Sequence, residues 1–291
     1  MYAGFLSFQS LKDKCFLFFL CAAAFCTVII VFLIYAFVLW EGFPHIEKTG
    51  WLLADKDWYP LEGEFNFYPT LVGSMLVALF ATMMAGIVGF FIAVGINFYS
   101  PKRISQILRS ILEMMAGIPS VIYGVWGLTI LVPFIGSIAP PGTSLLSGSL
   151  VLAMMITPFF TLFVDRSIRN ISGQLQMAVV ATDLSRWRSV SVIYWPLIKH
   201  SLCVGLVLAT TRAFGETMIV LMVCGNVPKF PVSLFSSVRT LTSTIALEMP
   251  YALGDHQSAL FFLGFLLLTI ISVLVALASL AFRGSQVNYE F

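Results

Sequence analysis

Two charged residues, Arg212 and Glu216, stand inside the apolar stretch 202–224. Residues four apart on an α-helix lie on one face, so we predict that the two side chains are neighbours. Charges at membrane depth are costly and usually face a bundle interior or a water-filled path. Because the guanidinium of Arg212 presents a fork of N–H donors that matches an oxyanion, we predict that it lines a path for an anion. Glu216 would hold Arg212 in place and prevent tight binding; the alternative is a structural Arg–Glu pair that clamps two helices.

Two polar residues outside this pair are further candidates for the same path. The hydroxyl of Thr217 can donate to an oxyanion or to a backbone carbonyl one turn earlier, whereas for Thr210 we favour the backbone bond. Arg239 stands at the start of a semi-apolar segment, 240–249, in the connection between the last two apolar stretches. It either helps to receive an anion or is an interfacial Arg that snorkels towards water.

The helices that must position these residues are predicted from the apolar composition of the chain. Of its 291 residues, 59% are hydrophobic and 10% are charged. An average soluble domain has about 25% charged residues. Windows of about 20 apolar residues mark membrane-spanning helices. We therefore predict an all-α membrane protein with six transmembrane helices, at residues 16–40, 69–98, 111–135, 145–164, 202–224 and 258–282.

The distribution of charge predicts the orientation of these helices. Cytoplasmic loops of membrane proteins are enriched in Lys and Arg, and 11 of the 16 basic residues fall on one side of the predicted spans. The opposite side carries the loop 41–68, which contains six acidic residues and two lysines. We therefore expect both termini to be cytoplasmic and this acidic loop to lie outside, where it either solvates the membrane surface or meets a partner protein.

The chain is predicted to form one membrane domain. It divides into residues 1–68, with the first helix and the outer loop, a core of five helices at 69–282, and a cytoplasmic tail at 283–291.

The net charge of +2 gives no indication of nucleic-acid binding. The five cysteines include no Cys-x-x-Cys pair and the three histidines are scattered, so we predict no metal site. The sequence also lacks a Gly-x-x-x-x-Gly-Lys-Ser/Thr loop, so we predict no ATPase site in this chain.

The cytoplasmic segment 165–200 is predicted to contain a docking element. Ala178, Ala181 and Leu184 recur at helical spacing and are followed by Trp187. A short amphipathic helix of this kind either lies on anionic lipid or inserts into a groove of a cytoplasmic partner. The segment resembles the coupling loop of ABC importer permeases, since Ala178, Trp187 and Pro196 fall at matching offsets.

Two positions of this segment depart from the family pattern. Met177 stands where the family has Glu, and Asp183 stands where it has Gly. Asp is among the residues that tolerate a tight bend, so the turn can survive. The resemblance implies that a cytoplasmic ATPase contacts Met177, Ala178, Asp183, Leu184 and Trp187, and the missing Glu bears on the strength of that contact.

Three further stretches resemble the PstC-type permeases of high-affinity phosphate importers: residues 212–218 continued by 223–226, residues 118–124, and residues 239–246. This resemblance implies a type I ABC importer permease fold and a multi-pass subunit of the bacterial inner membrane. The implied partners are a second homologous permease, two cytoplasmic ATPase subunits that hold ATP and Mg²⁺, and a periplasmic phosphate-binding protein. The chain would be no enzyme itself but would form half of the path for inorganic phosphate.

Two alternatives remain open at this point. The permease could carry another oxyanion, such as sulfate or molybdate, because Arg212 alone does not discriminate among them. The departures at Met177 and Asp183 also fit a scaffold or sensor subunit that does not transport.

Overall fold

The computed structural model describes residues 11–49, 58–173, 177 and 184–286. Most of them are helical, and five helices are long and apolar enough to cross a membrane. A sixth span is present if two helical segments that meet at a sharp bend, 102–116 and 120–136, are taken as one. The prediction of an all-α membrane protein with up to six spans is therefore confirmed, whereas the cytoplasmic location of the termini stays a prediction.

Four predicted spans correspond to long helices. These are α1 (Leu11–Thr49), α2 (Tyr68–Val94), α6 (Leu145–Arg169) and α12 (Asp255–Gln286). α2 continues through a π-helical turn, Gly95–Tyr99. Before α2, the strands β1 (Trp58–Tyr59) and β2 (Glu64–Phe65) form an antiparallel hairpin around the 3-10 turn Pro60–Glu62.

The third predicted span, 111–135, is wrong as a single helix. α3 (Lys102–Ala116) begins earlier, and the chain turns by 90° before α4 (Ser120–Trp126). Pro119 lacks an N–H and disfavours a helical conformation of the residue before it, which explains the break. α4 continues through a π-helical turn, Gly127–Leu131, into α5 (Val132–Gly136).

The fifth predicted span, 202–224, is also divided. Its helix begins upstream, where α8 (Arg186–Ser189) runs through a π-helical turn, Val190–Tyr194, into α9 (Trp195–Gly215). α9 ends at Gly215, and α10 (Met218–Val223) follows after a two-residue break. A further short helix, α11 (Leu241–Glu248), lies in the connection between α10 and α12.

The core lies where α2 and α6 pack against each other and against α9. Val151, Leu152 and Ile156 of α6 are completely buried. Small residues on α2 allow the close approach, since a Cβ at Gly89 would lie 2.9 Å from the ring of Phe160. Membrane helices depend on such close contact, because lipid is as apolar as their side chains and gives no hydrophobic driving force between them.

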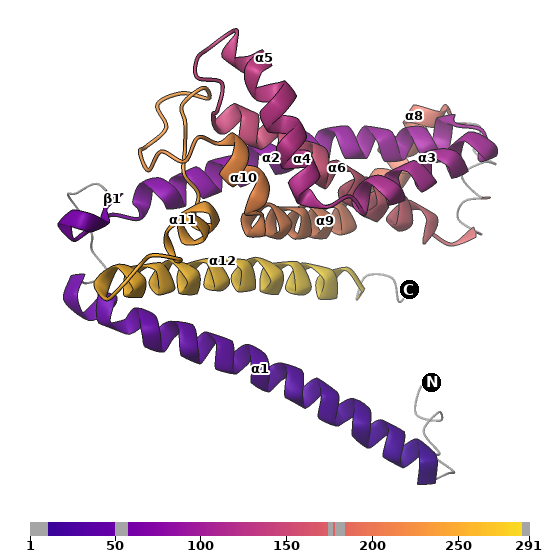
Figure 1. Ribbon diagram of the computed structural model, residues 1–291. Helices are drawn as coiled ribbons and strands as arrows, with labels where there is room; N and C mark the ends of the chain where they lie inside the picture. The colour runs from indigo at the N-terminus through magenta and orange to yellow at the C-terminus, as the bar shows by residue number, and fades with distance from the viewer. Residues whose placement is uncertain (1–10, 50–57, 174–176, 178–183, 287–291) are drawn as a thin grey trace.

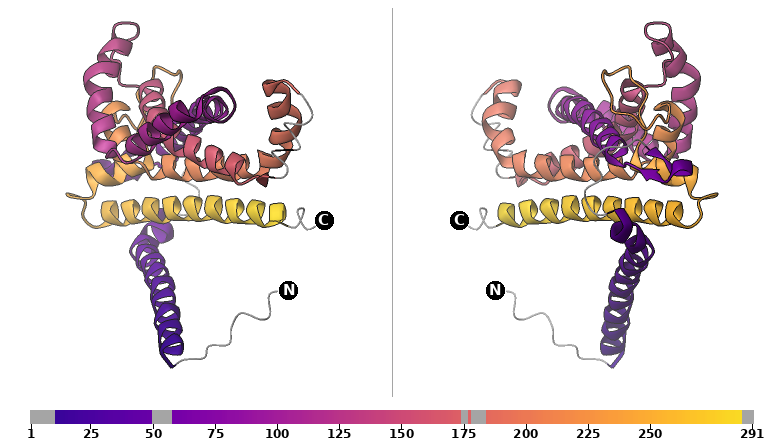
Figure 2. Two further views of the ribbon diagram at one scale, coloured as in Figure 1. Left: turned by 90° about the vertical axis from the view of Figure 1, so that its right-hand side faces the viewer. Right: turned by 90° about the vertical axis from the view of Figure 1, so that its left-hand side faces the viewer.

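α1 stands apart from this core and packs on α12. Figures 1 and 2 show α12 running between α1 and the other helices. At the contact, a Cβ on Gly42 would lie 2.9 Å from the backbone nitrogen of Phe262. The hydroxyl of Tyr35 donates to the carbonyl of Leu268 at 2.8 Å. Many large apolar side chains of α1 are exposed, as expected for a helix that faces lipid.

Candidate functional site

The helix that carries Arg212 ends before it reaches Glu216. Glu216 follows Gly215, a poor helix former, and has an extended backbone with φ −75° and ψ 129°. Its Oε1 accepts a hydrogen bond from the N–H of Met218 at 3.3 Å, which satisfies one free donor at the start of α10. The prediction that Arg212 and Glu216 share one helix face is therefore wrong. Among the described residues, no salt bridge joins the two side chains.

The guanidinium of Arg212 contacts an aromatic ring instead of a carboxylate. Its Cζ lies 5.8 Å from the ring centroid of Phe159 on α6. The residue is exposed in the isolated chain. A cation over a ring face keeps its N–H donors available. The Arg–Glu clamp is thus not formed in this structure, and the donors of Arg212 can still reach an anion.

The break between α9 and α10 is held by α11. Thr242 Oγ1 donates to the carbonyl oxygen of Glu216 at 2.9 Å. Non-helical backbone at membrane depth requires such partners, because lipid offers none. Side chains of α2, α9, α10 and α11 line a crevice beside Glu216 that leaves no room for a water molecule. The break between α9 and α10 is therefore closed where it faces α2 and α11.

Two threonines near the break differ in what their hydroxyls do. The backbone bond predicted for Thr210 is confirmed, since its Oγ1 donates to the carbonyl of Leu206 at 2.8 Å. Thr217 is half-buried at the position before α10 and makes no side-chain capping bond there. Its hydroxyl is therefore not committed to the end of that helix, and its contact with an anion stays a prediction.

Arg239 is part of a buried cluster around Glu248, which the sequence reasoning missed. Its Nη1 lies 2.5 Å from Glu248 Oε1, and its side chain is only 13% exposed. Glu248 also accepts hydrogen bonds from Trp58 Nε1, at 3.1 and 3.0 Å to its two oxygens, and lies 2.8 Å from His256 Nε2. Arg239 is therefore not an exposed snorkelling residue, and its charge is compensated. The sequence could have indicated a partner for Arg239, because Glu248 is the one acid in the segment 240–249.

A second buried acid, Asp165, was also missed. It is completely buried near the end of α6 and contacts Arg109 of α3 and Arg169 of its own helix, each at 3.0 Å. Asn97 Nδ2 donates to Asp165 Oδ1 at 2.8 Å. A lone acid among several basic residues at the end of an apolar stretch is the signal that could have identified it. The cluster joins the turn after α2, the middle of α3 and the end of α6.

The predicted ATPase-coupling residues are only partly described by the structure. Ala178 and Asp183 lie outside the described residues. Met177 is 74% exposed and Trp187, on α8, is 51% exposed. Leu184 is half-buried just before α8. The Trp187 ring is parallel to that of Phe91 on α2, with centroids 6.4 Å apart, so the predicted docking Trp packs on the bundle and still presents half of its surface.

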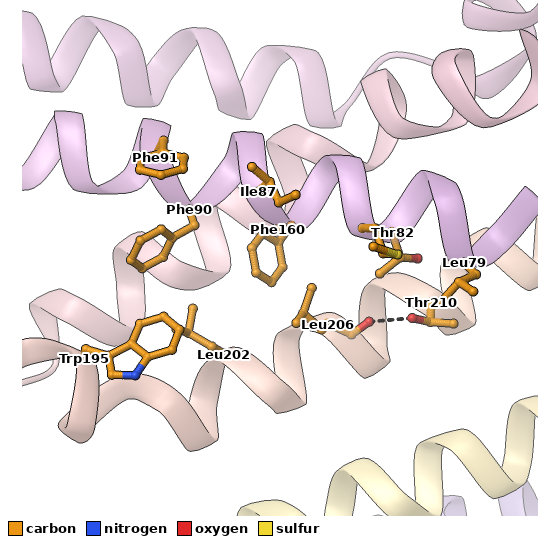
Figure 3. A pocket seen from close by; sticks show the side chains of 12 residues that line it. Leu79, Thr82, Ile87, Phe90, Phe91, Phe160, Trp195, Leu202, Leu206 and Thr210 are labelled. Carbon is orange, nitrogen blue, oxygen red and sulfur yellow. Dashed lines mark hydrogen bonds between the residues drawn. The ribbon is translucent and has the colours of Figure 1, made fainter. Parts of the chain in front are cut away.

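A separate feature is an apolar groove between α2 and α9. It has a volume of about 590 Å³, and Figure 3 shows Phe90, Phe160 and Trp195 among its lining residues. The hydroxyl of Thr210, at its edge, is bonded to the backbone of Leu206, as the dashed line in Figure 3 indicates. The lining of the groove is almost entirely apolar and suits hydrocarbon, because the hydroxyl of Thr82 and the indole N–H of Trp195 are few donors for an oxyanion. The candidate anion contacts therefore remain at the break and at Arg212.

Comparison with protein families and curated proteins places this arrangement among transport proteins. A family model described as "Binding-protein-dependent transport system inner membrane component" matches residues 85–284. The chain is 30% identical to "Phosphate transport system permease protein PstC" of Pasteurella multocida, over 87% of each chain. It is 29% identical to the protein of the same name from Mesorhizobium japonicum, over 78% of this chain and 76% of that protein. The "Probable ABC transporter permease protein YqgH" of Bacillus subtilis is 33% identical over 68% of this chain and 65% of its own.

Solved structures share the fold. A bacterial ABC transporter involved in the import of the acidic polysaccharide alginate aligns with a TM-score of 0.62 and 15% identity, covering 94% of this chain and 98% of its own. The MetNI methionine ABC transporter, in an inward-facing conformation, aligns with a TM-score of 0.59 and 16% identity, covering 73% of this chain and 93% of its own. At these identities the likeness concerns the fold, which is that of type I ABC importer permeases.

Proposed function

The chain belongs to the family of binding-protein-dependent transport system inner membrane components, and we propose that it is a transmembrane permease subunit of an ATP-driven importer of inorganic phosphate. The observation that carries this proposal is the alignment of most of the chain with relatives named as phosphate permeases. The segment that contains Arg212, Glu216 and Thr217 lies within the residues matched by the family model. The protein acts as a multi-pass subunit of the bacterial inner membrane.

The energy for transport comes from partner subunits. The sequence contains no phosphate-binding loop of the Gly-x-x-x-x-Gly-Lys-Ser/Thr type, so ATP and Mg²⁺ are held by two cytoplasmic ATPase subunits. These dock on the segment that includes Met177, Ala178, Asp183, Leu184 and Trp187. A second homologous permease completes the path, and a periplasmic phosphate-binding protein delivers the ion. The chain itself catalyses no reaction.

Arg212 is the residue that contacts phosphate during passage. A bare phosphate anion cannot enter a hydrocarbon core, because burying an unpaired charge costs many kcal/mol. The guanidinium offers donors in a geometry that matches the phosphate oxygens. In this structure the guanidinium lies over the ring of Phe159, a contact that leaves its N–H donors available. Conduction requires that the ion can also leave, so a single Arg contact suits a transient site.

The break after Gly215 supports the same role. In transporters, interrupted helices place free backbone groups at the ion site near the middle of the membrane. Here the break interrupts the helix at Glu216 and Thr217, which are both half-buried. Glu216 does not contact Arg212. Its role is to cap the start of α10 and so to fix the break between α9 and α10. Thr217 is positioned to donate its hydroxyl to the passing anion.

Reconstituted transport tests this function. The chain is co-expressed with its partner permease, ATPase subunits and binding protein, and the purified complex is placed in proteoliposomes with ATP on the ATPase side. We expect ATP-dependent uptake of radiolabelled phosphate that excess sulfate does not inhibit. Loss of a charge-assisted hydrogen bond removes about 1.5–3 kcal/mol, so Arg212→Ala should reduce uptake by roughly tenfold or more. Arg212→Lys should retain part of the activity, because it keeps the charge and loses the fork.

The control is Lys199→Ala, which removes an exposed charge near the start of α9 and should leave uptake unchanged. An assembled wild-type complex that takes up sulfate and no phosphate would overturn the substrate. An assembled complex that transports neither ion would favour a scaffold or sensor subunit. Normal uptake by Arg212→Ala would show that Arg212 does not line the path.

A further inference from the structure

Three segments meet at the buried carboxylate of Glu248, and one of them, the strand that carries Trp58, is 190 residues away in the sequence. Trp58 comes from β1, Arg239 from the connection before α11, and His256 from the first turn of α12. The side chain of Glu248 is 6% exposed, and each partner binds it at hydrogen-bond distance. A buried carboxylate is stable only when its partners are kept in place, so this cluster constrains the positions of all three segments.

α11 connects this cluster to the break in the α9–α10 span. Glu248 is the last residue of this eight-residue helix, and Thr242 is in its first turn. Thr240 and Ser243 form a reciprocal capping box that makes the start of the helix rigid. The backbone N–H of Leu241 donates to Ser74 Oγ of α2 at 2.8 Å, and Thr242 Oγ1 donates to the Glu216 carbonyl at 2.9 Å. α11 therefore connects Glu248 at its end to the backbone of Glu216 at its start.

We infer that Glu248 is a positioning residue that links the β1–β2 hairpin to the helix break at Glu216, so that a displacement of the hairpin opens or closes the break. This inference rests on the proposed transport function, because it assigns the hairpin to the outer face, where the acidic segment 41–68 is expected. The ring of Trp58 is 3% exposed, whereas Tyr59 beside it is 47% exposed. A displacement of the exposed side of the hairpin therefore moves the indole of Trp58, whose N–H is bonded to Glu248.

Opening the break changes the groups that an anion can contact near Glu216 and Thr217. The crevice beside Glu216 has no room for water while Thr242 holds the Glu216 carbonyl. Withdrawing α11 frees this carbonyl and widens the space next to Thr217. Arg239 stays paired with Glu248 in this motion and serves as part of the link. Its contact with phosphate stays a prediction.

Substitution of Trp58 by Phe tests the link with little change in packing. Trp58→Phe keeps an aromatic ring against Phe65 and removes the indole N–H that bonds Glu248. In the reconstituted complex we expect normal assembly and basal ATPase activity, with the stimulation by phosphate-loaded binding protein reduced about fivefold. Glu248→Gln should lower the ratio of stimulated to basal activity at least as much, with some loss of assembly, because a neutral amide leaves Arg239 without its buried counter-ion. The matched control is Tyr59→Phe on the same hairpin, which should keep full stimulation.

A second measurement does not depend on phosphate. A cysteine at position 217, in a chain whose exposed residues Cys15, Cys21, Cys26 and Cys203 are replaced by Ala, reports the width of the break through its rate of modification by a water-soluble maleimide. We expect Trp58→Phe and Glu248→Gln to raise this rate severalfold, and Tyr59→Phe to leave it unchanged.

The outcomes separate this inference from the proposed function. If the wild-type complex is not stimulated by phosphate-loaded binding protein, the phosphate function fails, and the modification rate at position 217 still decides the link. An unchanged modification rate in both variants would overturn the link. Equal losses of basal and stimulated ATPase activity, together with poor assembly, would also overturn it, because they would indicate that Glu248 only stabilises the fold.

Discussion

Arg109 of α3 binds the carboxylate of Asp165 of α6 through the Nε–Nη2 edge of its guanidinium. Its Nε lies 3.0 and 3.1 Å from the two oxygens, and its Nη2 lies 3.0 Å from Oδ1. Asn97 completes the arrangement, because its amide donates to Asp165 and accepts from Arg109 Nη2 at 3.2 Å. The contact fixes α3, which the sequence placed partly in a loop, against the end of α6 that leads into the predicted coupling segment.

Asp165→Asn should destabilise the protein strongly. The substitution leaves Arg109 without its buried counter-ion, and removing one partner of a buried ion pair costs about 3–5 kcal/mol. We expect the Tm of the detergent-solubilised protein to fall by roughly 6 °C or more. Arg169→Gln is the control: this partner of Asp165 is 51% exposed, and an exposed pair is worth about 0–1 kcal/mol. Equal Tm values for the two variants would contradict the assignment of Asp165 as the buried anchor.

Thr242→Val should impair transport more than stability. It removes the hydroxyl that holds the Glu216 carbonyl and keeps the shape of the side chain. Loss of one neutral hydrogen bond costs about 1 kcal/mol, which corresponds to roughly a fivefold reduction in phosphate uptake. Thr244→Val is the matched control in the same helix, because Thr244 Oγ1 bonds only to the carbonyl of Thr240 one turn earlier. If both variants transport equally, the break does not depend on Thr242.

Gly42→Ala should weaken the contact between α1 and α12. A methyl group at this position would meet the backbone of Phe262, which cannot move aside as a flexible side chain can. Overpacking of this kind costs about 1–3 kcal/mol. Gly264→Ala, on α12 in the same interface, is the control, since its nearest neighbour would be Val38 Cγ1 at 3.6 Å. We expect a lower Tm for Gly42→Ala alone, and tolerance of both changes would contradict the close backbone approach.

Met177→Glu should change neither stability nor transport greatly. The side chain is 74% exposed, and exposed substitutions usually alter stability by less than about 0.5 kcal/mol. If the chain is a working permease, its coupling segment is already functional, and ATPase activity and uptake should each change by less than about twofold. The measurement compares both rates in assembled complexes of the wild type and the variant. A sharp rise in transport-linked ATPase activity would indicate impaired coupling and favour the sensor alternative.

Local composition was enough to predict where the chain crosses the membrane. Apolar runs of sufficient length predicted α1, α2, α6 and α12, because a spanning helix must present lipid-soluble side chains along its whole length. The breaks were harder to predict. Pro119 signals an interruption through its missing N–H, but the 90° turn there depends on how α3 and α4 pack. The end of α9 at Gly215 carried a weaker signal, since Gly is also common within membrane helices.

The sequence by itself determined the class of the protein and the approximate spans, because these follow from side-chain polarity along short stretches; the anion contacts it predicts stay predictions. Only the tertiary structure decided which charges meet. Arg212 and Glu216 are near in sequence and do not pair, whereas Trp58 and Glu248, 190 residues apart, do. The physical reason is that a buried carboxylate takes whichever donors the packing of distant helices brings within about 3 Å. Hydropathy along the chain carries no information about that packing.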